Sequence, residues 1–146
     1  MSQEIRAFRS EDTESVVELW NACGLTVPWN DPRRDIDRKL RVRAELFLVA
    51  IQDDRIVGSV MAGYEGHRGW INYLAVHPTR QRAGIGTSLM EQAERLLREA
   101  GCPKINLQVR RSNLQAIGFY ESVGFREDDV VSLGKRLVSD GSSSAG

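Results

Sequence analysis

Two glycines, Gly84 and Gly86, lie between an apolar run at residues 70–76 and a strongly amphipathic pattern that begins at Ile85. Glycine adopts left-handed backbone conformations without steric cost, so two glycines at a strand-to-helix corner can aim several backbone N–H groups into one concave space. The helix that follows adds the positive end of its dipole. The pattern therefore predicts an α/β corner that binds an anion, most naturally a phosphate group.

The pattern after the glycines predicts a long helix. Its apolar face recurs at helical spacing and comprises Ile85, Leu89, Ala93, Leu96, Leu97 and Ala100. The opposite face carries two pairs of opposite charge four residues apart, Glu91 with Arg95 and Glu94 with Arg98. Gly101 stands where a glycine commonly ends a helix. We therefore expect a stable helix with one face buried against a sheet.

The rest of the chain alternates strand-like and helix-like segments. Strands are expected at residues 4–8, 46–51, 56–64, 70–76 and 105–109, with one bent strand or two short ones at 125–137. Helices are expected from Asp12 to 23, from Pro32 to about residue 42, and at 114–123 with Asn113 as N-cap. This order predicts one α/β domain over residues 1–138, with mixed strand directions, and a frayed tail at 139–146.

Composition narrows the class of protein. Lysine plus arginine and aspartate plus glutamate number 20 each, which gives no support to a nucleic-acid or polybasic membrane partner. Two cysteines, Cys23 and Cys102, are too few for a disulfide framework and suit a reducing compartment. The chain shows no signal-peptide pattern and no stretch that approaches the about 20 apolar residues of a membrane span. We therefore expect a cytoplasmic protein.

Several kinds of site could use the glycine pair. A dinucleotide-binding corner needs a third glycine and an acidic residue near the end of the next strand, at about Asn106, and both are missing. A P-loop needs Gly-Lys-Ser/Thr, which is also missing. A helix start whose glycines serve only packing stays open. Arg80 and Arg82 flank the corner and favour ligand binding over packing alone.

Two motifs resemble the GNAT N-acetyltransferase superfamily. After residues 74–78, the sequence is similar to the acyl-coenzyme A motif of that family, and reads Gln81-x-x-Gly84-x-Gly86. The second motif follows in the family's order, and reads Asn113-x-x-Ala116-x-x-Phe119-Tyr120-Glu121-x-x-Gly124-Phe125. The peptides at residues 28–32, 63–69, 101–104 and 133–137 are also similar to small bacterial YpeA-type acetyltransferases. Two departures are Arg82, where the family often has glycine, and Ala83, where it often has a basic residue.

The resemblance implies a single-domain α/β fold with a mixed, mostly antiparallel sheet of about six to seven strands and about four flanking helices. It also implies acetyl-coenzyme A as co-substrate, with its pyrophosphate on the glycine corner and its pantetheine arm along an unpaired edge of the preceding strand. A backbone N–H near Leu74 or Ala75 would polarise the thioester carbonyl. The cofactor-binding residues so implied are Leu74, Ala75, Val76, Gln81, Arg82, Ala83, Gly84, Ile85, Gly86, Thr87, Asn113 and Tyr120.

The resemblance makes Tyr120 the general acid that protonates the leaving thiolate, although an aromatic residue at this place in a helix equally suits a core. Asn113 serves either as the helix cap or as a partner of the cofactor's amides. Glu65 is a candidate general base, and its alternative is a place in a solvated turn together with His67. Tyr73 lies on the site strand and is placed to hold a water relay.

In the family, the segment between the first two helices lines the acceptor side. Here that segment supplies Trp29, Asn30, Asp31 and Asp35. The first three, together with Tyr73, are the candidate acceptor-binding residues. Aromatic and acidic side chains suit a cationic amine. Arginines are interleaved from residue 33 onward, so a solvated helix face explains the same charges.

The sequence therefore predicts an N-acetyltransferase that moves an acetyl group from acetyl-coenzyme A to a primary amine by direct attack in a ternary complex. Neither cysteine has an activating neighbour, so an acyl-cysteine route is not expected. No metal is expected, because no His/Cys cluster has ligand spacing. The alternative is a catalytically silent acyl-coenzyme A-binding module. The acceptor amine, and whether the protein is a monomer or a homodimer, stay open.

Overall fold

The computed structural model describes residues 3–140. The strands and helices are, in chain order, β1 (Glu4–Ala7), α1 (Thr13–Ala22), α2 (Pro32–Leu40), β2 (Phe47–Gln52), β3 (Arg55–Tyr64), β4 (Gly69–Val76), α3 (Ile85–Glu99), β5 (Ile105–Leu107) and α4 (Leu114–Ser122). Short 3₁₀ turns lie at Ser10–Asp12, Ala44–Leu46 and Pro78–Arg80. Most elements therefore lie where their sequence patterns predict them.

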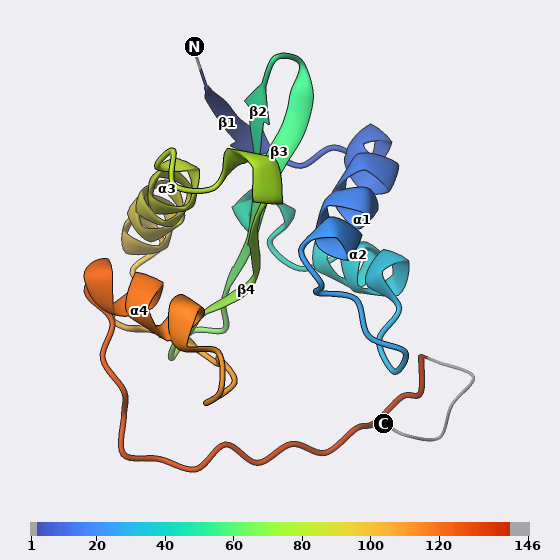
Figure 1. Cartoon of the computed structure of the whole chain (residues 1–146). Helices are drawn as coiled ribbons and strands as arrows, with labels where there is room; N and C mark the ends of the chain where they lie inside the picture. Colours follow the sequence, from blue (N-terminus) through green and yellow to red (C-terminus); the bar gives the residue numbers. More distant parts are fainter. Residues whose placement is uncertain (1–2, 141–146) are drawn as a thin grey trace.

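The described strands form one sheet in the order β1-β2-β3-β4-β5. Neighbours from β1 to β4 are antiparallel, whereas β4 and β5 are parallel because α3 connects them. Helices α1 and α2 cover one face of the sheet, and α3 and α4 lie on the other side (Figure 1). The predicted mixed, mostly antiparallel α/β sheet is confirmed.

The core consists of two apolar layers, one on each face of the sheet. The layer against α3 includes Val57, Val60, Ala62, Ile71, Ile85, Leu89, Ala93 and Leu97. The layer under α1 and α2 includes Val16, Val17, Trp20, Ile36, Phe47, Val49, Met61 and Ala75. Successive strand residues point to opposite faces, so β3 supplies Val60 to the first layer and Met61 to the second. The sheet is thus buried on both sides and gives the site a rigid support.

The helix ends follow the predicted chemistry with local differences. Asp31 accepts the backbone N–H of Arg33 at 2.9 Å and so caps α2, which begins at Pro32 as expected but ends at Leu40 rather than near residue 42. Asp12 precedes α1 but does not accept an N–H of that helix. It binds the Arg6 guanidinium at 2.7 Å instead.

Side-chain pairing on α3 also differs in part from the prediction. Glu94 pairs with Arg98 at 2.7 Å, as expected. Arg95 pairs with Glu99 at 2.7 Å, and its predicted pairing with Glu91 does not form. Both observed pairs link residues four apart, so either choice satisfies the same helical spacing. On the next strand, β5 ends at Leu107 rather than at residue 109.

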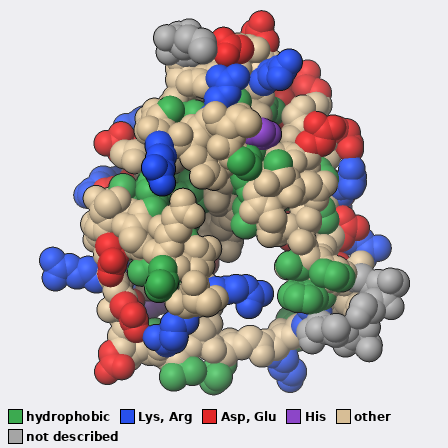
Figure 2. Space-filling model, viewed as in Figure 1, with side chains coloured by type: hydrophobic (Ala, Val, Ile, Leu, Met, Phe, Trp, Pro, Cys, Tyr) green, Lys and Arg blue, Asp and Glu red, His purple; other side chains and the backbone are tan. Residues whose placement is uncertain are grey.

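The number of strands is the main correction to the sequence prediction. The described residues form five strands rather than six or seven, because residues 125–137 form none. This segment touches β5 through side chains: Asp128 accepts from Lys104 at 2.9 Å and from Asn106 at 3.0 Å. It then crosses an opening below the sheet toward the α2 side (Figures 1 and 2). A strand forms only where a neighbouring edge accepts its backbone groups, and β5 pairs with β4 alone.

As a consequence, several apolar side chains of this segment are exposed. They are Val130, Val131, Leu133 and Leu137, and the next residue, Val138, is exposed as well. The predicted frayed tail overlaps the described chain only at residues 139 and 140, where the Asp140 carboxylate pairs with Arg38 at 2.6 Å. Residues 141–146 lie outside the described range, so most of that prediction stays untested.

Candidate active site

The glycine loop (residues 81–87) turns the chain from β4 into α3. Arg82 and Gly84 both adopt left-handed conformations, with φ of +68° and +83°. A Cβ added at Gly84 would meet no atom within 4 Å, so the backbone conformation, and not space, calls for glycine here. Residues 81–84 are exposed, which leaves the corner open to solvent and to ligands.

The loop gathers unpaired backbone donors at the start of α3. Ser88 is the first residue there whose N–H finds a helical acceptor, the Gly84 carbonyl at 3.0 Å. Within residues 3–140, none of the N–H groups of residues 82–87 donates to another protein group. A helix N-terminus carries such free donors together with the positive end of its dipole. This is the arrangement that binds phosphate groups in other proteins.

The side chains around the loop divide into structural and available groups. Arg80 is directed away, toward Asp53 at 3.3 Å. The Gln81 amide donates to the Val76 carbonyl at 3.2 Å and holds the loop against the end of β4. Arg82 contacts no acidic side chain of the described chain. Of the two arginines that flank the corner in sequence, Arg82 is therefore the one free to meet an anion.

Gly86 brings α3 close to both β4 and α4. A Cβ there would lie 3.3 Å from Phe119 Cζ, which is tighter than ordinary packing, and 3.6 Å from Val76 Cγ2, which is an ordinary van der Waals contact. The absence of a side chain therefore permits α4 to contact the first turn of α3. Since Tyr120 follows Phe119 on α4, this contact also sets how far Tyr120 lies from the glycine loop.

Strand β4 separates from β5 beside the loop. The two strands pair over three positions, and the last pair is Ile71 with Leu107. β4 continues to Val76, so among residues 3–140 no strand lies beside its edge from residue 72 onward. The next N–H, of His77, donates to β3 at 2.8 Å, and strand periodicity then points the backbone groups of Leu74 and Val76 toward the open edge. An extended ligand with amide groups can add to such an edge as a further strand.

A β-bulge lies at the point where this edge opens. Asn72 and Ala75 of β4 pair with β3 residues only two apart, so Tyr73 and Leu74 together face Val60. Tyr73 adopts a left-handed conformation with φ of +51°. Bulges of this kind disrupt the hydrogen-bond ladder locally and redirect side chains, and they are frequent beside active sites.

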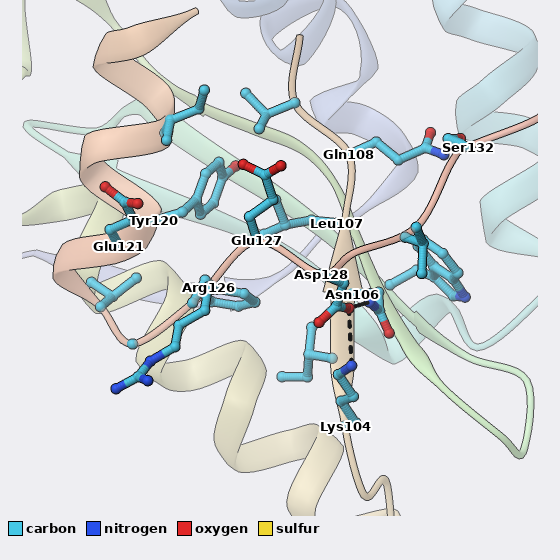
Figure 3. A pocket seen from close by; sticks show the side chains of 18 of the residues that line it. Lys104, Asn106, Leu107, Gln108, Tyr120, Glu121, Arg126, Glu127, Asp128 and Ser132 are labelled. Carbon is cyan, nitrogen blue, oxygen red and sulfur yellow. Dashed lines mark hydrogen bonds and ion pairs between the residues drawn. The ribbon is translucent and has the colours of Figure 1, made fainter. Parts of the chain in front are cut away.

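Tyr120 lies on α4 in the wall of a cleft of about 1270 Å³. The cleft is lined by α4, β5 and the segment after α4, and Figure 3 shows the Tyr120 ring pointing from α4 toward β5. The ring packs edge-on against Phe119 and Phe125, with centroid distances of 5.3 and 5.7 Å. Burial raises the pKa of the Tyr120 phenol. The hydroxyl group therefore keeps its proton at neutral pH and is able to donate it.

Asn113 is confirmed as the N-cap of α4. Its Oδ1 accepts the backbone N–H of Ala116 at 3.1 Å. Its Nδ2 makes no hydrogen bond to any described residue, so one side chain can cap the helix and still offer a donor. The predicted contact of Asn113 with cofactor amides stays a prediction.

Glu65 stabilises the turn between β3 and β4. Its Oε1 accepts the backbone N–H groups of His67 and Arg68, both at 2.5 Å. The hydrogen bonds from Arg68 and His67 lower the pKa of the Glu65 carboxyl. A carboxylate that is held in its own turn and has a lowered pKa is a weak proton acceptor. The role of Glu65 as general base stays a prediction that this geometry does not favour.

Tyr73 connects the bulge to the helices on the opposite face. Its ring stacks on Trp20 with centroids 3.7 Å apart, and its hydroxyl donates to Asp35 Oδ2 on α2 at 2.7 Å. Burial, together with this hydrogen bond to Asp35, raises the pKa of Tyr73. The other oxygen of Asp35 accepts from Arg38 at 3.2 Å. Sequence analysis placed Asp35 on the acceptor side but predicted no contact with Tyr73, because a carboxylate among arginines on a helix looks the same whether it is solvated or in contact with a strand.

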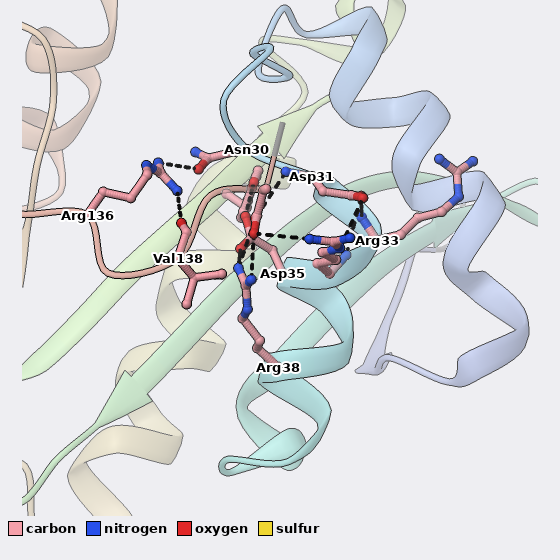
Figure 4. Close-up of polar contacts among 10 residues, drawn as sticks. Asn30, Asp31, Arg33, Asp35, Arg38, Arg136 and Val138 are labelled. Atoms are coloured by element: carbon pink, nitrogen blue, oxygen red, sulfur yellow. Dashed lines mark hydrogen bonds and ion pairs between the residues drawn. The ribbon is translucent and has the colours of Figure 1, made fainter. Parts of the chain in front are cut away.

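The remaining predicted acceptor residues lie in the loop that leads into α2. Trp29 is partly buried there, and Asp31 uses one carboxylate oxygen as the helix cap. Asn30 Oδ1 accepts from Arg136 of the C-terminal segment at 2.7 Å, as Figure 4 shows. The structure thus gathers these residues at the start of α2, near the Tyr73–Asp35 contact, with several of their polar groups already paired.

Neither a metal-binding cluster nor a reactive thiol is found among residues 3–140. Among residues 3–140, no group of three or more His, Cys, Asp or Glu side chains is placed to hold a metal ion. Cys23 and Cys102 are free thiols, and burial raises the pKa of Cys23, which makes it a poor nucleophile. Over the same residues, no helix combines the length and the apolar character that crossing a membrane requires.

Comparison with known proteins agrees with this geometry. The model of the family described as "Acetyltransferase (GNAT) family" matches residues 8–125. Acetyltransferase ECA0875 of Pectobacterium atrosepticum is 50% identical over 137 residues, which make up 94% of this chain and 97% of that protein. The match therefore spans nearly the full length of both chains.

Solved structures share the same architecture. Ard1 from Thermoplasma volcanium is 29% identical and superposes with a TM-score of 0.78, covering 86% of this chain and 84% of its own. The PaiA N-acetyltransferase from Thermoplasma acidophilum, solved in complex with coenzyme A, is 22% identical with a TM-score of 0.72, covering 90% of this chain and 94% of its own. At the lower identity the likeness establishes the fold alone.

Proposed function

This chain belongs to the acetyltransferase (GNAT) family, and from that membership we propose that it transfers the acetyl group of acetyl-coenzyme A to a primary amine of a small molecule or a protein. The observation that carries the proposal is the glycine loop, where the N–H groups of residues 82–87 stand unpaired at the start of α3. Such a corner favours a ligand with a diphosphate group.

Other parts of the site suit the rest of coenzyme A. The edge of β4 around Leu74, which has no described strand beside it, offers backbone partners for the amides of the pantetheine arm, whereas the Val76 carbonyl already accepts from Gln81. Asn113 Nδ2 is a further donor, at the start of α4. Arg82 is the available cation beside the loop. These are residues that the resemblance to the family implies for the cofactor.

Acetyl-coenzyme A would supply an acetyl group as a thioester. The amine nitrogen forms a bond to the carbonyl carbon, the carbon–sulfur bond breaks, and coenzyme A departs as a thiolate. Negative charge develops on the carbonyl oxygen during this attack. We place the backbone N–H of Leu74, at the bulge, as the donor to that oxygen. A preorganised donor of this kind lowers the barrier by about 3 kcal/mol.

Two protons must move during the reaction. Tyr120 is the proposed donor to the departing thiolate, because it lines the cleft and its pKa is raised by burial. For the proton of the attacking ammonium, we favour Asp35 over Glu65, either directly or through a water molecule. Both carboxylates accept hydrogen bonds, but the bond from Tyr73 places Asp35 beside the bulge, whereas Glu65 is held by two N–H groups in the turn between β3 and β4.

The test is amine-dependent release of the coenzyme A thiol. The purified chain is mixed with acetyl-coenzyme A and a panel of polyamines, amino acids, aminoglycosides and peptides with free N-termini. Free thiol is measured with a chromogenic disulfide reagent, and each product is checked by mass spectrometry for one added acetyl group. Thiol release that requires an amine and yields an acetylated product supports the proposal. Coenzyme A binding without transfer to any amine would instead indicate the alternative, a binding module without catalysis.

A further inference from the structure

Ser59 is a polar residue in an otherwise apolar part of the core. Ser59 lies in the middle of β3 and is fully buried, with 0% exposure. A buried hydroxyl costs free energy unless it is hydrogen-bonded on both sides. Ser59 Oγ accepts the indole N–H of Trp20 at 2.9 Å and donates to the backbone carbonyl of Tyr73 at 2.9 Å. Because the indole donates to the oxygen, the hydroxyl proton is left to point at Tyr73.

The acceptor of that bond is a carbonyl of the bulge. Tyr73 and Leu74 share one β3 partner, so the regular ladder is interrupted at this peptide. Ser59 supplies the hydrogen bond that a neighbouring strand would otherwise give. The Tyr73 carbonyl is thereby held toward β3, and it does not rotate freely as an unpaired bulge carbonyl would.

The Tyr73 carbonyl and the Leu74 N–H belong to the same peptide unit. The described chain contains no cis peptide bond, so this unit is planar and trans, and its C=O and N–H point in opposite directions. Holding the carbonyl toward β3 therefore turns the Leu74 N–H away from β3. That is the side on which β4 has no neighbouring strand beyond Ile71.

Two helices hold the same residue by its side chain. Trp20 of α1 stacks on the Tyr73 ring, and Asp35 of α2 accepts its hydroxyl at 2.7 Å. Trp20 thus contacts Tyr73 twice, once through the ring and once through Ser59. The left-handed conformation of Tyr73, which is unfavourable for an aromatic residue, is fixed from three elements.

We propose that Ser59 is a positioning residue for acetyl transfer, which aims the Leu74 N–H at the thioester oxygen by fixing the Tyr73–Leu74 peptide. Trp20 assists by fixing the direction of the Ser59 hydroxyl. This inference rests on the proposed function, because it assumes that the Leu74 N–H is the donor to the thioester oxygen. It adds a residue that makes no contact with the substrate and acts through the backbone.

The kinetic test compares Ser59→Ala with Val49→Ala. Val49 is the β2 residue paired with Ser59 in the sheet and is also fully buried, so its truncation weakens the same core and removes none of the hydrogen bonds of the network. We expect Ser59→Ala to lower kcat by at least about tenfold, because small misplacements of a catalytic group are costly. Its KM for acetyl-coenzyme A and its Kd for coenzyme A should stay within about twofold of the original chain, since the glycine loop is unchanged. Val49→Ala should lose stability with little change in kcat.

A second measurement does not depend on the acceptor amine. The backbone amide of Leu74 is followed by NMR while acetyl-coenzyme A is added to the original chain and to Ser59→Ala. A new hydrogen bond to the thioester oxygen should move the Leu74 proton resonance downfield in the original chain. In Ser59→Ala this shift should be smaller, while the amides of residues 84–87 shift as before.

The two measurements separate the two proposals. If kcat of Ser59→Ala falls no further than that of Val49→Ala, or if its Leu74 shift equals that of the original chain, Ser59 has only a structural role. If the original chain acetylates no amine but the Leu74 shift is lost in Ser59→Ala, Ser59 still aims the Leu74 N–H at the thioester oxygen, and it is the proposed transfer that fails. If the Leu74 amide of the original chain does not respond to acetyl-coenzyme A, the positioning role is wrong, even where transfer is observed.

Discussion

Replacing Gly84 by alanine tests the glycine loop with the smallest possible change. The added Cβ meets no atom within 4 Å, so the replacement introduces no clash. It does place a side chain on a residue with φ of +83°, a conformation that disfavours L-residues by about 1–2 kcal/mol. The effect on the protein depends on whether the loop keeps this conformation.

The strain must appear either in stability or in binding. If the loop keeps its conformation, the free energy of unfolding falls by about 1–2 kcal/mol, which is a few degrees in Tm, and coenzyme A affinity is unchanged. If the loop relaxes, stability is retained, but binding must restore the strained form and Kd rises by about 5- to 30-fold. The two losses should therefore sum to about 1–2 kcal/mol in Gly84→Ala. Gly84→Asn should show smaller losses, because asparagine tolerates the left-handed region.

Isothermal calorimetry with coenzyme A and urea denaturation measure the two terms. Gly101→Ala is the matched control, since Gly101 has φ of +88°, also has nothing within 4 Å of an added Cβ, and lies at the opposite end of α3. It should lose the same stability and no affinity. The reasoning is refuted if Gly84→Ala changes neither quantity, or if Gly101→Ala weakens coenzyme A binding as much.

Three further experiments address single side chains. Tyr120→Phe should lower kcat and leave coenzyme A affinity unchanged. Because burial raises the pKa of Tyr120, deprotonation of this residue should not slow the original chain until the pH exceeds about 10, the ordinary pKa of tyrosine. Arg82→Ala should weaken coenzyme A binding several-fold, and the loss should be larger at low salt. Arg80→Ala should weaken binding less, because Arg80 pairs with Asp53, and calorimetry at two salt concentrations measures both effects. Burial would raise the pKa of Asp12, but hydrogen bonds from Arg6 and a backbone N–H hold this pKa below its usual range. The ionised Asp12 therefore stabilises the folded protein above pH about 4, and this contribution is lost as the pH falls through the lowered pKa. Arg6→Ala should remove it, so the free energy of unfolding should depend less on pH in acid than in the original chain.

The elements with strong local signals were predicted well. The 3.6-residue apolar period predicted α3, and Gly101 was predicted to end it, which agrees with the φ of +88° found there. Both signals are local, because helical spacing and glycine conformation depend on neighbouring residues only. Asn113 caps its helix as expected, since a cap joins residues only two or three apart. The family motifs then placed the glycine loop and Tyr120 on the correct elements.

The C-terminal segment was predicted wrongly for a physical reason. Its alternating apolar residues, such as Val131 and Leu133, match a strand pattern, yet the segment forms no ladder. A strand has no hydrogen-bond partners of its own, so the pattern states a tendency and the neighbouring edge decides the outcome. Here contacts of the segment with β5 run through side chains, such as Asp128 with Lys104.

By itself, the sequence determined the glycine loop, the helix that follows it and the family to which they belong, because these rest on backbone conformation and spacing over a few residues. Only the tertiary structure decided how the bulge of β4 is held. The bonds that hold it join Trp20 with Ser59, 39 residues apart, and Tyr73 with Asp35, 38 residues apart. No local pattern encodes such bonds, since each forms only after helices α1 and α2 pack against the sheet.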